Sequence, residues 1–143
     1  MEYKNNIINK NNNKTSVIGV IGLGYVGMPL SLSFVKAGFK VIGFDIDKKK
    51  IEQIENKKSY IWSITSEDIS NALLKGFDAT VDFSKISKLD TIIICVPTPL
   101  TKYGQPDLKY LINSIKLIIP YIKKGQLISV ESTTYPGTTE EEV

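Results

Sequence analysis

Short, continuous runs of apolar residues recur along the chain and predict the strands of a sheet. Residues 91–96 (TIIICV) form the most apolar run, which is too continuous for a strand with one face in water. Strands buried on both faces are typical of parallel sheets. The predicted strands cover residues 17–21, 40–44, 78–82, 91–96 and 127–130.

Between these runs, apolar residues recur at helical spacing. In residues 107–119, Leu111, Ile112 and Ile115 fall on one face of the predicted helix. Further helices are predicted at 28–37, 48–57 and 67–74. The alternation of strands and helices predicts an α/β fold with a doubly wound, mostly parallel sheet and helices on both of its faces.

The two ends of the sequence depart from this alternation. Residues 1–15 are an Asn/Lys-rich tract with almost nothing to bury, so we expect a mobile tail followed by one domain over residues 16–143. A nucleic-acid-binding arm is disfavoured, because the tract lacks arginines and interleaved aromatic residues. Thr138 and Glu141 form the pattern that opens a helix, yet the sequence stops soon afterwards. We therefore expect a domain truncated at its C-terminus, from a longer protein.

Composition narrows the chemistry that this chain can perform. Its 143 residues carry a formal net charge of +3 and include no histidine, which excludes histidine catalysis. The single cysteine, Cys95, excludes an intrachain disulfide and a Cys-based zinc site, and we predict no metal. Because Cys95 ends the most apolar strand, we expect it to pack rather than to act as a nucleophile.

The distribution of charge and hydrophobicity bears on partners and location. The part of the chain after the basic tract is close to neutral, so neither nucleic acid nor an anionic membrane is expected as a partner. No apolar run reaches the roughly 18 residues that cross a bilayer, and the N-terminus has no apolar signal-peptide core. We expect a cytoplasmic location by default.

The first predicted strand leads into Gly22-Leu23-Gly24-Tyr25-Val26-Gly27, which matches the dinucleotide-binding pattern G-x-G-x-x-G. Gly22 permits a tight turn, Gly24 lets the backbone approach a pyrophosphate, and Gly27 lets the next helix pack closely on the strand. The phosphates would face free N–H groups at the positive end of that helix. Tyr25 and Val26 are candidate cofactor contacts in the same turn, although packing of the turn is the simpler role for their side chains.

Asp45 closes the second predicted strand, roughly 20 residues after the glycine motif, where a dinucleotide site has its ribose-binding acid. Its carboxylate would accept hydrogen bonds from the ribose hydroxyls and repel a 2′-phosphate, which favours NAD over NADP. The neighbouring residues Lys48, Lys49 and Lys50 weaken that inference. The alternative is a structural strand–turn–helix with an incidental acid. The glycine motif, Asp45 and the alternation of strands and helices together indicate a Rossmann-type sheet.

Four segments resemble the nucleotide-sugar dehydrogenases, the UDP-glucose/GDP-mannose dehydrogenase family, over residues 16–143. They are GLGYVGMPL (22–30), GFDID (43–47), CVPTPLTKYGQPDLKYL (95–111) and ESTTYPGTTEE (131–141). Within the family, SYI (59–61), PTPLTK and the STTYPGTTEE ending are most similar to UDP-N-acetylglucosamine 6-dehydrogenases of bacterial surface-polysaccharide synthesis. The UDP-N-acetylmannosamine and UDP-glucose enzymes remain the near alternatives.

The resemblance implies two successive NAD-dependent oxidations that convert the C6 alcohol of a UDP-sugar to a carboxylate. In the family a cysteine nucleophile holds the aldehyde-level stage, and it lies in a part of the family's chain that has no counterpart here. This fragment is therefore expected to bind NAD and to lack turnover. The UDP-sugar site would lie mostly in the absent part, and the full-length parent is expected to be a homodimer or a higher oligomer.

The same resemblance assigns roles to individual positions. Lys50 stands where the family has a basic residue beside the adenosine ribose, and Thr98 matches a threonine that contacts the cofactor. Glu131 and Thr134 align with the acid and the threonine of the family's E-x-x-T-x-P segment, which implies cofactor contacts for both and a supporting role in catalysis for Thr134. All of these positions follow the ends of predicted strands, where open parallel sheets bind ligands.

Two other classes of protein are alternatives to a dehydrogenase. A non-catalytic, NAD-sensing Rossmann domain would explain the missing catalytic groups, but the ESTTYPG segment favours the dehydrogenase. A Rossmann-like methyltransferase is disfavoured, because its second and third turn glycines are usually less strict.

Overall fold

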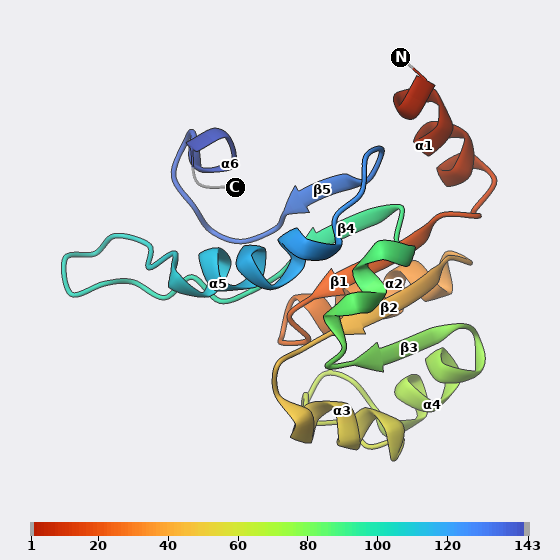
Figure 1. The fold of residues 1–143 in the computed structure, drawn as a ribbon. Coiled ribbons are helices and arrows are strands. Elements are labelled where there is room, and N and C mark those ends of the chain that lie inside the picture. Colours follow the sequence, from red (N-terminus) through yellow and green to blue (C-terminus); the bar gives the residue numbers. More distant parts are fainter. Residues whose placement is uncertain (1, 142–143) are drawn as a thin grey trace.

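A computed structural model describes residues 2–141 and confirms the α/β Rossmann-type fold. One five-stranded parallel sheet has the order β3-β2-β1-β4-β5. Strands β2 and β3 are added on one side of β1, and β4 and β5 on the other side. The strand order therefore reverses between β1 and β4, which are neighbours in space (Figure 1). The strands are β1 (Val17–Ile21), β2 (Lys40–Phe44), β3 (Phe77–Thr80), β4 (Thr91–Ile94) and β5 (Leu127–Val130).

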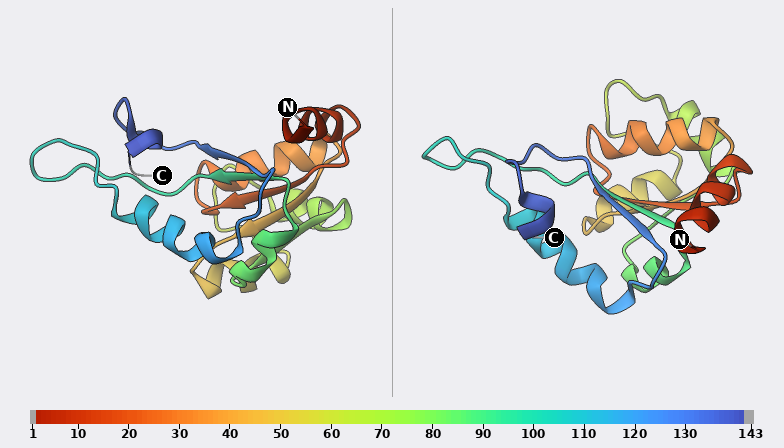
Figure 2. Two further views of the ribbon diagram at one scale, coloured as in Figure 1. Left: turned by 45° about the horizontal axis from the view of Figure 1, so that its top comes forward. Right: turned by 90° about the horizontal axis from the view of Figure 1, so that it is seen from above.

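Helices cover both faces of the sheet, as Figure 2 shows from two further directions. One core cluster packs α2 (Gly27–Lys36), α3 (Lys48–Glu55) and α4 (Ser66–Leu74) against one face. The other packs the 3-10 helix η1 (Phe83–Lys88) and α5 (Lys109–Ile118) against the opposite face. Neighbouring strand residues alternate between the clusters, as in β4, where Ile92 faces one cluster and Ile93 the other. Burial on both faces explains the continuous apolar runs of the sequence.

Several predicted boundaries needed correction. The strand predicted at 91–96 ends at Ile94, and the strand predicted at 78–82 is Phe77–Thr80. Asp82 instead caps η1, because its carboxylate accepts a hydrogen bond from Ser84 N at 3.0 Å. The sequence analysis had no element at η1, a polar connection whose only buried residue is Ile86. The remaining short helices are η2 (Ile119–Tyr121) and α6 (Thr138–Glu141).

The N-terminal tract, which we expected to be a mobile tail over residues 1–15, forms a helix over most of its length. Its mobility stays a prediction. Helix α1 (Glu2–Asn12) buries none of its residues. It contacts the rest of the chain at both ends. The Tyr3 ring lies against Gly125, Lys10 Nζ pairs with Asp90 Oδ1 at 2.5 Å, and Asn11 accepts a hydrogen bond from Ser16. These partners lie near the amino end of the strands, so tertiary contacts order a segment whose own composition does not.

Candidate functional site

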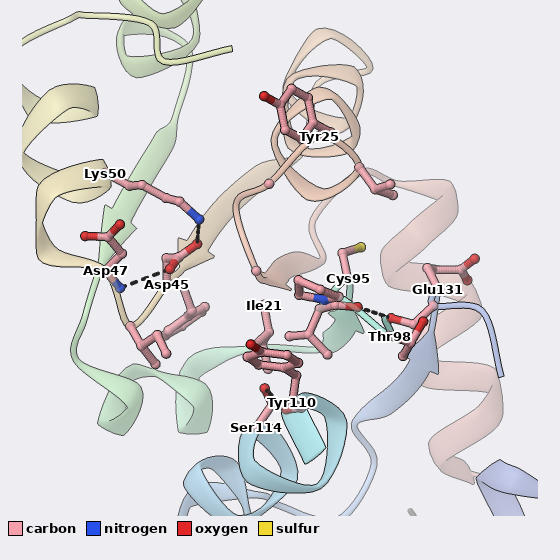
Figure 3. Close-up of a pocket in the computed structure, with 18 of the residues that line it drawn as sticks. Ile21, Tyr25, Asp45, Asp47, Lys50, Cys95, Thr98, Tyr110, Ser114 and Glu131 are labelled. Atoms are coloured by element: carbon pink, nitrogen blue, oxygen red, sulfur yellow. Dashed lines mark hydrogen bonds and ion pairs between the residues drawn. The ribbon is translucent and has the colours of Figure 1, made fainter. Parts of the chain in front are cut away.

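A cavity of about 910 Å³ lies beyond the carboxyl ends of the strands. Its walls include the turn after β1, the residues after β2, β4 and β5, and one side of α5. This is the switch point of the sheet, where open α/β sheets bind ligands. In Figure 3, Asp45 and Lys50 stand on one side of the cavity, Thr98 and Glu131 stand on the other, and the turn that carries Tyr25 lies between them.

The glycines of the turn are required for different reasons. Gly22 has a φ of +91°, and a Cβ there would lie 2.7 Å from the carbonyl oxygen of Cys95. A Cβ on Gly27 would lie 1.8 Å from the carbonyl oxygen of Gly22. A Cβ on Gly24, by contrast, would meet no protein atom within 4 Å, although Gly24 lines the cavity. The fold thus requires two of the glycines, and the third leaves an open cradle in the wall of the cavity.

The turn leads directly into the N-terminus of α2. Its N-cap residue, Val26, supplies no side-chain hydrogen bond to the first turn of the helix. Unpaired N–H groups at a helix N-terminus carry a partial positive charge and favour an anion. Tyr25 and Val26 are 72% and 57% exposed, and both line the cavity. Their side chains therefore do not pack the turn, which corrects the simpler role that we had expected.

Asp45 is nearly buried at the end of β2, and its carboxylate faces the cavity. It accepts hydrogen bonds from Leu23 N at 2.9 Å and Asp47 N at 3.0 Å, and it pairs with Lys50 Nζ at 3.0 Å. A carboxylate has about four acceptor positions, so these three donors fix its orientation and leave capacity for a ribose hydroxyl. The ion pair brings Lys50 to the same edge of the cavity as Asp45. Its place beside the adenosine ribose stays a prediction.

The loops after β4 and β5 form the opposite wall. Thr98 is half-buried and Glu131 is exposed, and both line the cavity. The Glu131 carboxylate accepts a hydrogen bond from Ser129 Oγ at 2.6 Å. The two loops are joined where Ser132 Oγ donates to the carbonyl oxygen of Val96 at 2.8 Å. The structure therefore brings Thr98 and Glu131 together on one wall of the cavity.

Two candidate residues are not among those that line the cavity. Gly27 is buried below it, at the start of α2, where it permits close packing of the turn. Thr134 is half-buried in the segment after β5 and lies beyond the lining residues Glu131, Ser132 and Thr133. Its role in catalysis stays a prediction.

Cys95 is 7% exposed at the end of β4 and packs in the core. Burial, with a smaller contribution from the charge of Glu131, raises the pKa of its thiol to about 11. The thiolate is the nucleophilic form, and it is scarce at neutral pH with such a pKa. Cys95 therefore packs in the core as expected, at the wall of the cavity. That it does not act as the nucleophile stays a prediction.

One wall of the cavity was missed in the sequence analysis. Tyr110, Asn113, Ser114 and Leu117 follow one another at helical spacing on α5, and all four line the cavity. Their spacing is a signal that could have been found, because it marks a second stripe beside the buried one. Tyr60, in the connection between α3 and α4, also lines the cavity, and the sequence pointed to it only as part of the SYI segment.

Two further features are absent from the described part of the chain, residues 2–141. No helix there is long and apolar enough to cross a membrane. The same residues hold no group of three or more His, Cys, Asp or Glu side chains that could bind a metal ion.

Comparisons with known proteins agree with this geometry. The profile of the UDP-glucose/GDP-mannose dehydrogenase family, NAD binding domain, matches residues 16–143. The UDP-N-acetyl-D-glucosamine 6-dehydrogenase of Salmonella typhi is 41% identical over 125 residues, which cover 87% of this chain and 29% of that protein. The UDP-N-acetyl-D-mannosamine dehydrogenase of Methanocaldococcus jannaschii is 40% identical over 130 residues, which cover 87% of this chain and 30% of that protein.

A solved structure shows the same likeness in three dimensions. The crystal structure of a ternary complex of GDP-mannose dehydrogenase from Pseudomonas aeruginosa matches with a TM-score of 0.82 at 32% identity, over 88% of this chain and 30% of that one. The chain thus spans about 30% of the length of the relatives it matches. The matched part carries the glycine turn, Asp45 and the cavity between them. The chain belongs to the UDP-glucose/GDP-mannose dehydrogenase family and corresponds to its NAD-binding domain.

Proposed function

We propose that this chain is the NAD-binding portion of a nucleotide-sugar 6-dehydrogenase. The parent enzyme oxidises the C6 alcohol of a UDP-amino sugar, UDP-N-acetylglucosamine, to a carboxylate with two NAD, for the synthesis of a surface polysaccharide. The similarity to the Salmonella typhi enzyme supports this choice of sugar. The similar identity to a UDP-N-acetyl-D-mannosamine dehydrogenase keeps that sugar, and UDP-glucose, as alternative substrates.

One observation carries the proposal: an open glycine turn and a fixed carboxylate face the same cavity. Gly24 offers backbone without a side chain, at the N-terminus of a helix that has no side-chain cap. Asp45, held by three donors, stands at the edge where the adenosine ribose would lie. A structural turn would need Gly22 and Gly27 but would have no need of Gly24.

The other wall of the cavity suits the remaining half of the dinucleotide. NAD, when bound, supplies the hydride acceptor for the oxidation. Thr98 and Glu131 would contact the cofactor on the side away from Asp45, because their loops follow β4 and β5 across the switch point. In this proposal they orient the cofactor. Thr134 would support proton or water placement at the reacting carbon.

The proposal also assigns the catalytic nucleophile to a part of the parent that this chain does not contain. The buried, protonated thiol of Cys95 is unsuited to hold an aldehyde-level intermediate. We place the nucleophilic cysteine in the parent outside this sequence, together with most of the UDP-sugar site. Assembly of the parent as a homodimer or a higher oligomer, and its cytoplasmic location, stay predictions.

The test begins with titration of the purified chain with NADH and with NADPH. We expect NADH to bind at least about tenfold more tightly, because the Asp45 carboxylate repels a 2′-phosphate. Asp45→Asn should reduce that preference, since it removes the charge and keeps the size of the side chain. Tighter binding of NADPH by the wild-type chain would contradict the role given to Asp45.

Turnover assays of the chain and of its longer parent test where the nucleophile lies. The chain alone should not oxidise UDP-N-acetylglucosamine with NAD, because it lacks an activated nucleophile. Steady turnover would contradict the assignment of the nucleophile to another part of the parent. An NAD-sensing domain would also bind NADH without turnover, so the longer reading frame decides between the two. A parent whose added part carries a reactive cysteine, and which oxidises the sugar, supports the dehydrogenase.

A further inference from the structure

Tyr60 joins the connection between α3 and α4 to the glycine turn. Its hydroxyl donates a hydrogen bond to the carbonyl oxygen of Leu23 at 2.8 Å, and its side chain lines the cavity. Leu23 stands between Gly22 and Gly24. This contact bridges 37 positions of sequence and touches the part of the turn that precedes the open cradle.

Tyr60 completes a set of three restraints on Leu23. The Leu23 side chain is fully buried and lies over Gly43 of β2, where an added Cβ would be 2.8 Å from Leu23 Cδ2. The Leu23 N–H donates to Asp45 Oδ2 at 2.9 Å. Tyr60 then holds the carbonyl oxygen. Because a peptide group is planar and trans, a fixed Leu23 carbonyl also fixes the direction of the Gly24 N–H.

Tyr60 is itself held firmly enough to act as a brace. The next residue, Ile61, is 4% exposed in the core, and Ile64 is buried beside it. Ser59 Oγ donates to Ile61 O at 3.0 Å and accepts from Ile61 N at 3.1 Å. Burial, and to a lesser extent the charges of Asp45 and Asp47, raise the pKa of Tyr60 above its usual value. The hydroxyl therefore remains a donor throughout the neutral pH range.

We propose that Tyr60 is a positioning residue for dinucleotide binding, whose hydroxyl holds the glycine turn in the shape that receives the pyrophosphate. The proposal rests on the proposed function in one respect, the binding of NAD at this turn. It adds a link from the α3–α4 connection to the diphosphate, through one backbone carbonyl. Removal of that hydrogen bond should weaken the binding of ligands that contain a diphosphate. It should leave the binding of ligands without a diphosphate unchanged.

The experiment compares Tyr60→Phe with the wild-type chain. Dissociation constants are measured for NADH, for ADP-ribose, which retains the diphosphate, and for adenosine, which lacks it. We expect binding of NADH and ADP-ribose to weaken about three- to tenfold, as for the loss of one neutral hydrogen bond, with adenosine unchanged. The matched control is Tyr103→Phe, because Tyr103 is 78% exposed and lies outside the cavity lining. It should leave all three constants unchanged.

Hydrogen exchange adds a readout that does not depend on affinity. The Gly24 amide should exchange faster in Tyr60→Phe than in the wild-type chain, while amides of the central strands should not. Equal affinities for ADP-ribose in Tyr60→Phe and wild type would overturn the inference alone. An equal loss for adenosine, or a variant that does not fold, would overturn it in favour of a general structural role. Failure of the wild-type chain to bind NADH would overturn the proposed function as well.

Discussion

Gly24 and Gly27 lie three positions apart in one turn, yet the structure gives them different reasons to lack a side chain. Gly24→Ala should leave the free energy of unfolding nearly unchanged, because the added Cβ meets no protein atom within 4 Å. It should weaken NADH binding at least about tenfold, because the methyl group occupies the space that a diphosphate needs. Denaturant unfolding and NADH titration of the same preparation check both halves of this prediction.

Gly27→Ala serves as the opposite case. Its Cβ would lie 1.8 Å from the carbonyl oxygen of Gly22, so α2 or the turn must shift. We expect a loss of about 1–3 kcal/mol in the free energy of unfolding, the usual cost of overpacking. If Gly24→Ala were the less stable of the two variants, or bound NADH as well as the wild type, the cradle would be wrongly placed.

Cys95 gives a second prediction for a single residue. With a pKa of about 11 against an ordinary value of 9.0, the thiol should hold about a hundredfold less thiolate at pH 8 than an exposed cysteine does. Alkylation of the folded chain should therefore be slow at pH 8 and should accelerate as the pH rises towards 11. The denatured chain is the control, since Cys95 is its only cysteine. Equal rates at pH 8 in the folded and denatured chains would refute the buried, protonated state.

The strands and helices show most clearly what could be predicted from the sequence and what could not. The strand at 127–130 was predicted to the residue, because a short apolar run between turn residues has few other outcomes. Helix α1 was missed because it has no buried face, and its contacts are with Asp90 and Gly125, which are distant in sequence. The hydrogen bond of Tyr60 could not be predicted for a similar reason: periodicity does not report which loop hydroxyl reaches the carbonyl of Leu23.

Helix α1 lies outside the residues that match the family and offers a prediction at the same scale. Deletion of residues 1–15 should leave NADH affinity unchanged within about twofold, because α1 is anchored near the amino end of the strands and the cavity lies at the other end. Stability should fall by only about 1 kcal/mol, since Lys10 and Asp90 form a partly exposed ion pair and α1 buries no residue.

The measurement is urea unfolding and NADH titration of the shortened chain. Lys10→Ala in the full sequence should reproduce part of the stability loss, while the bond from Val17 N to Asp90 at 3.0 Å remains. A large loss of NADH affinity on deletion would contradict this expectation, because it would show that α1 affects the cavity at the opposite end of the strands.

The glycine turn, Asp45 and the opposite wall of the cavity belong to one folded domain. NADH binding should therefore raise the unfolding temperature of the whole domain. A ligand that binds only the folded state at about 100 times its dissociation constant adds about 2.7 kcal/mol, and a domain of this size gains about 2–4 °C in Tm per kcal/mol. We therefore expect NADH to raise the Tm by about 5–10 °C. The shift should persist in the chain without residues 1–15 and shrink strongly in Asp45→Ala. The same shift in Asp45→Ala as in the wild type would mean that NADH binds elsewhere on the molecule.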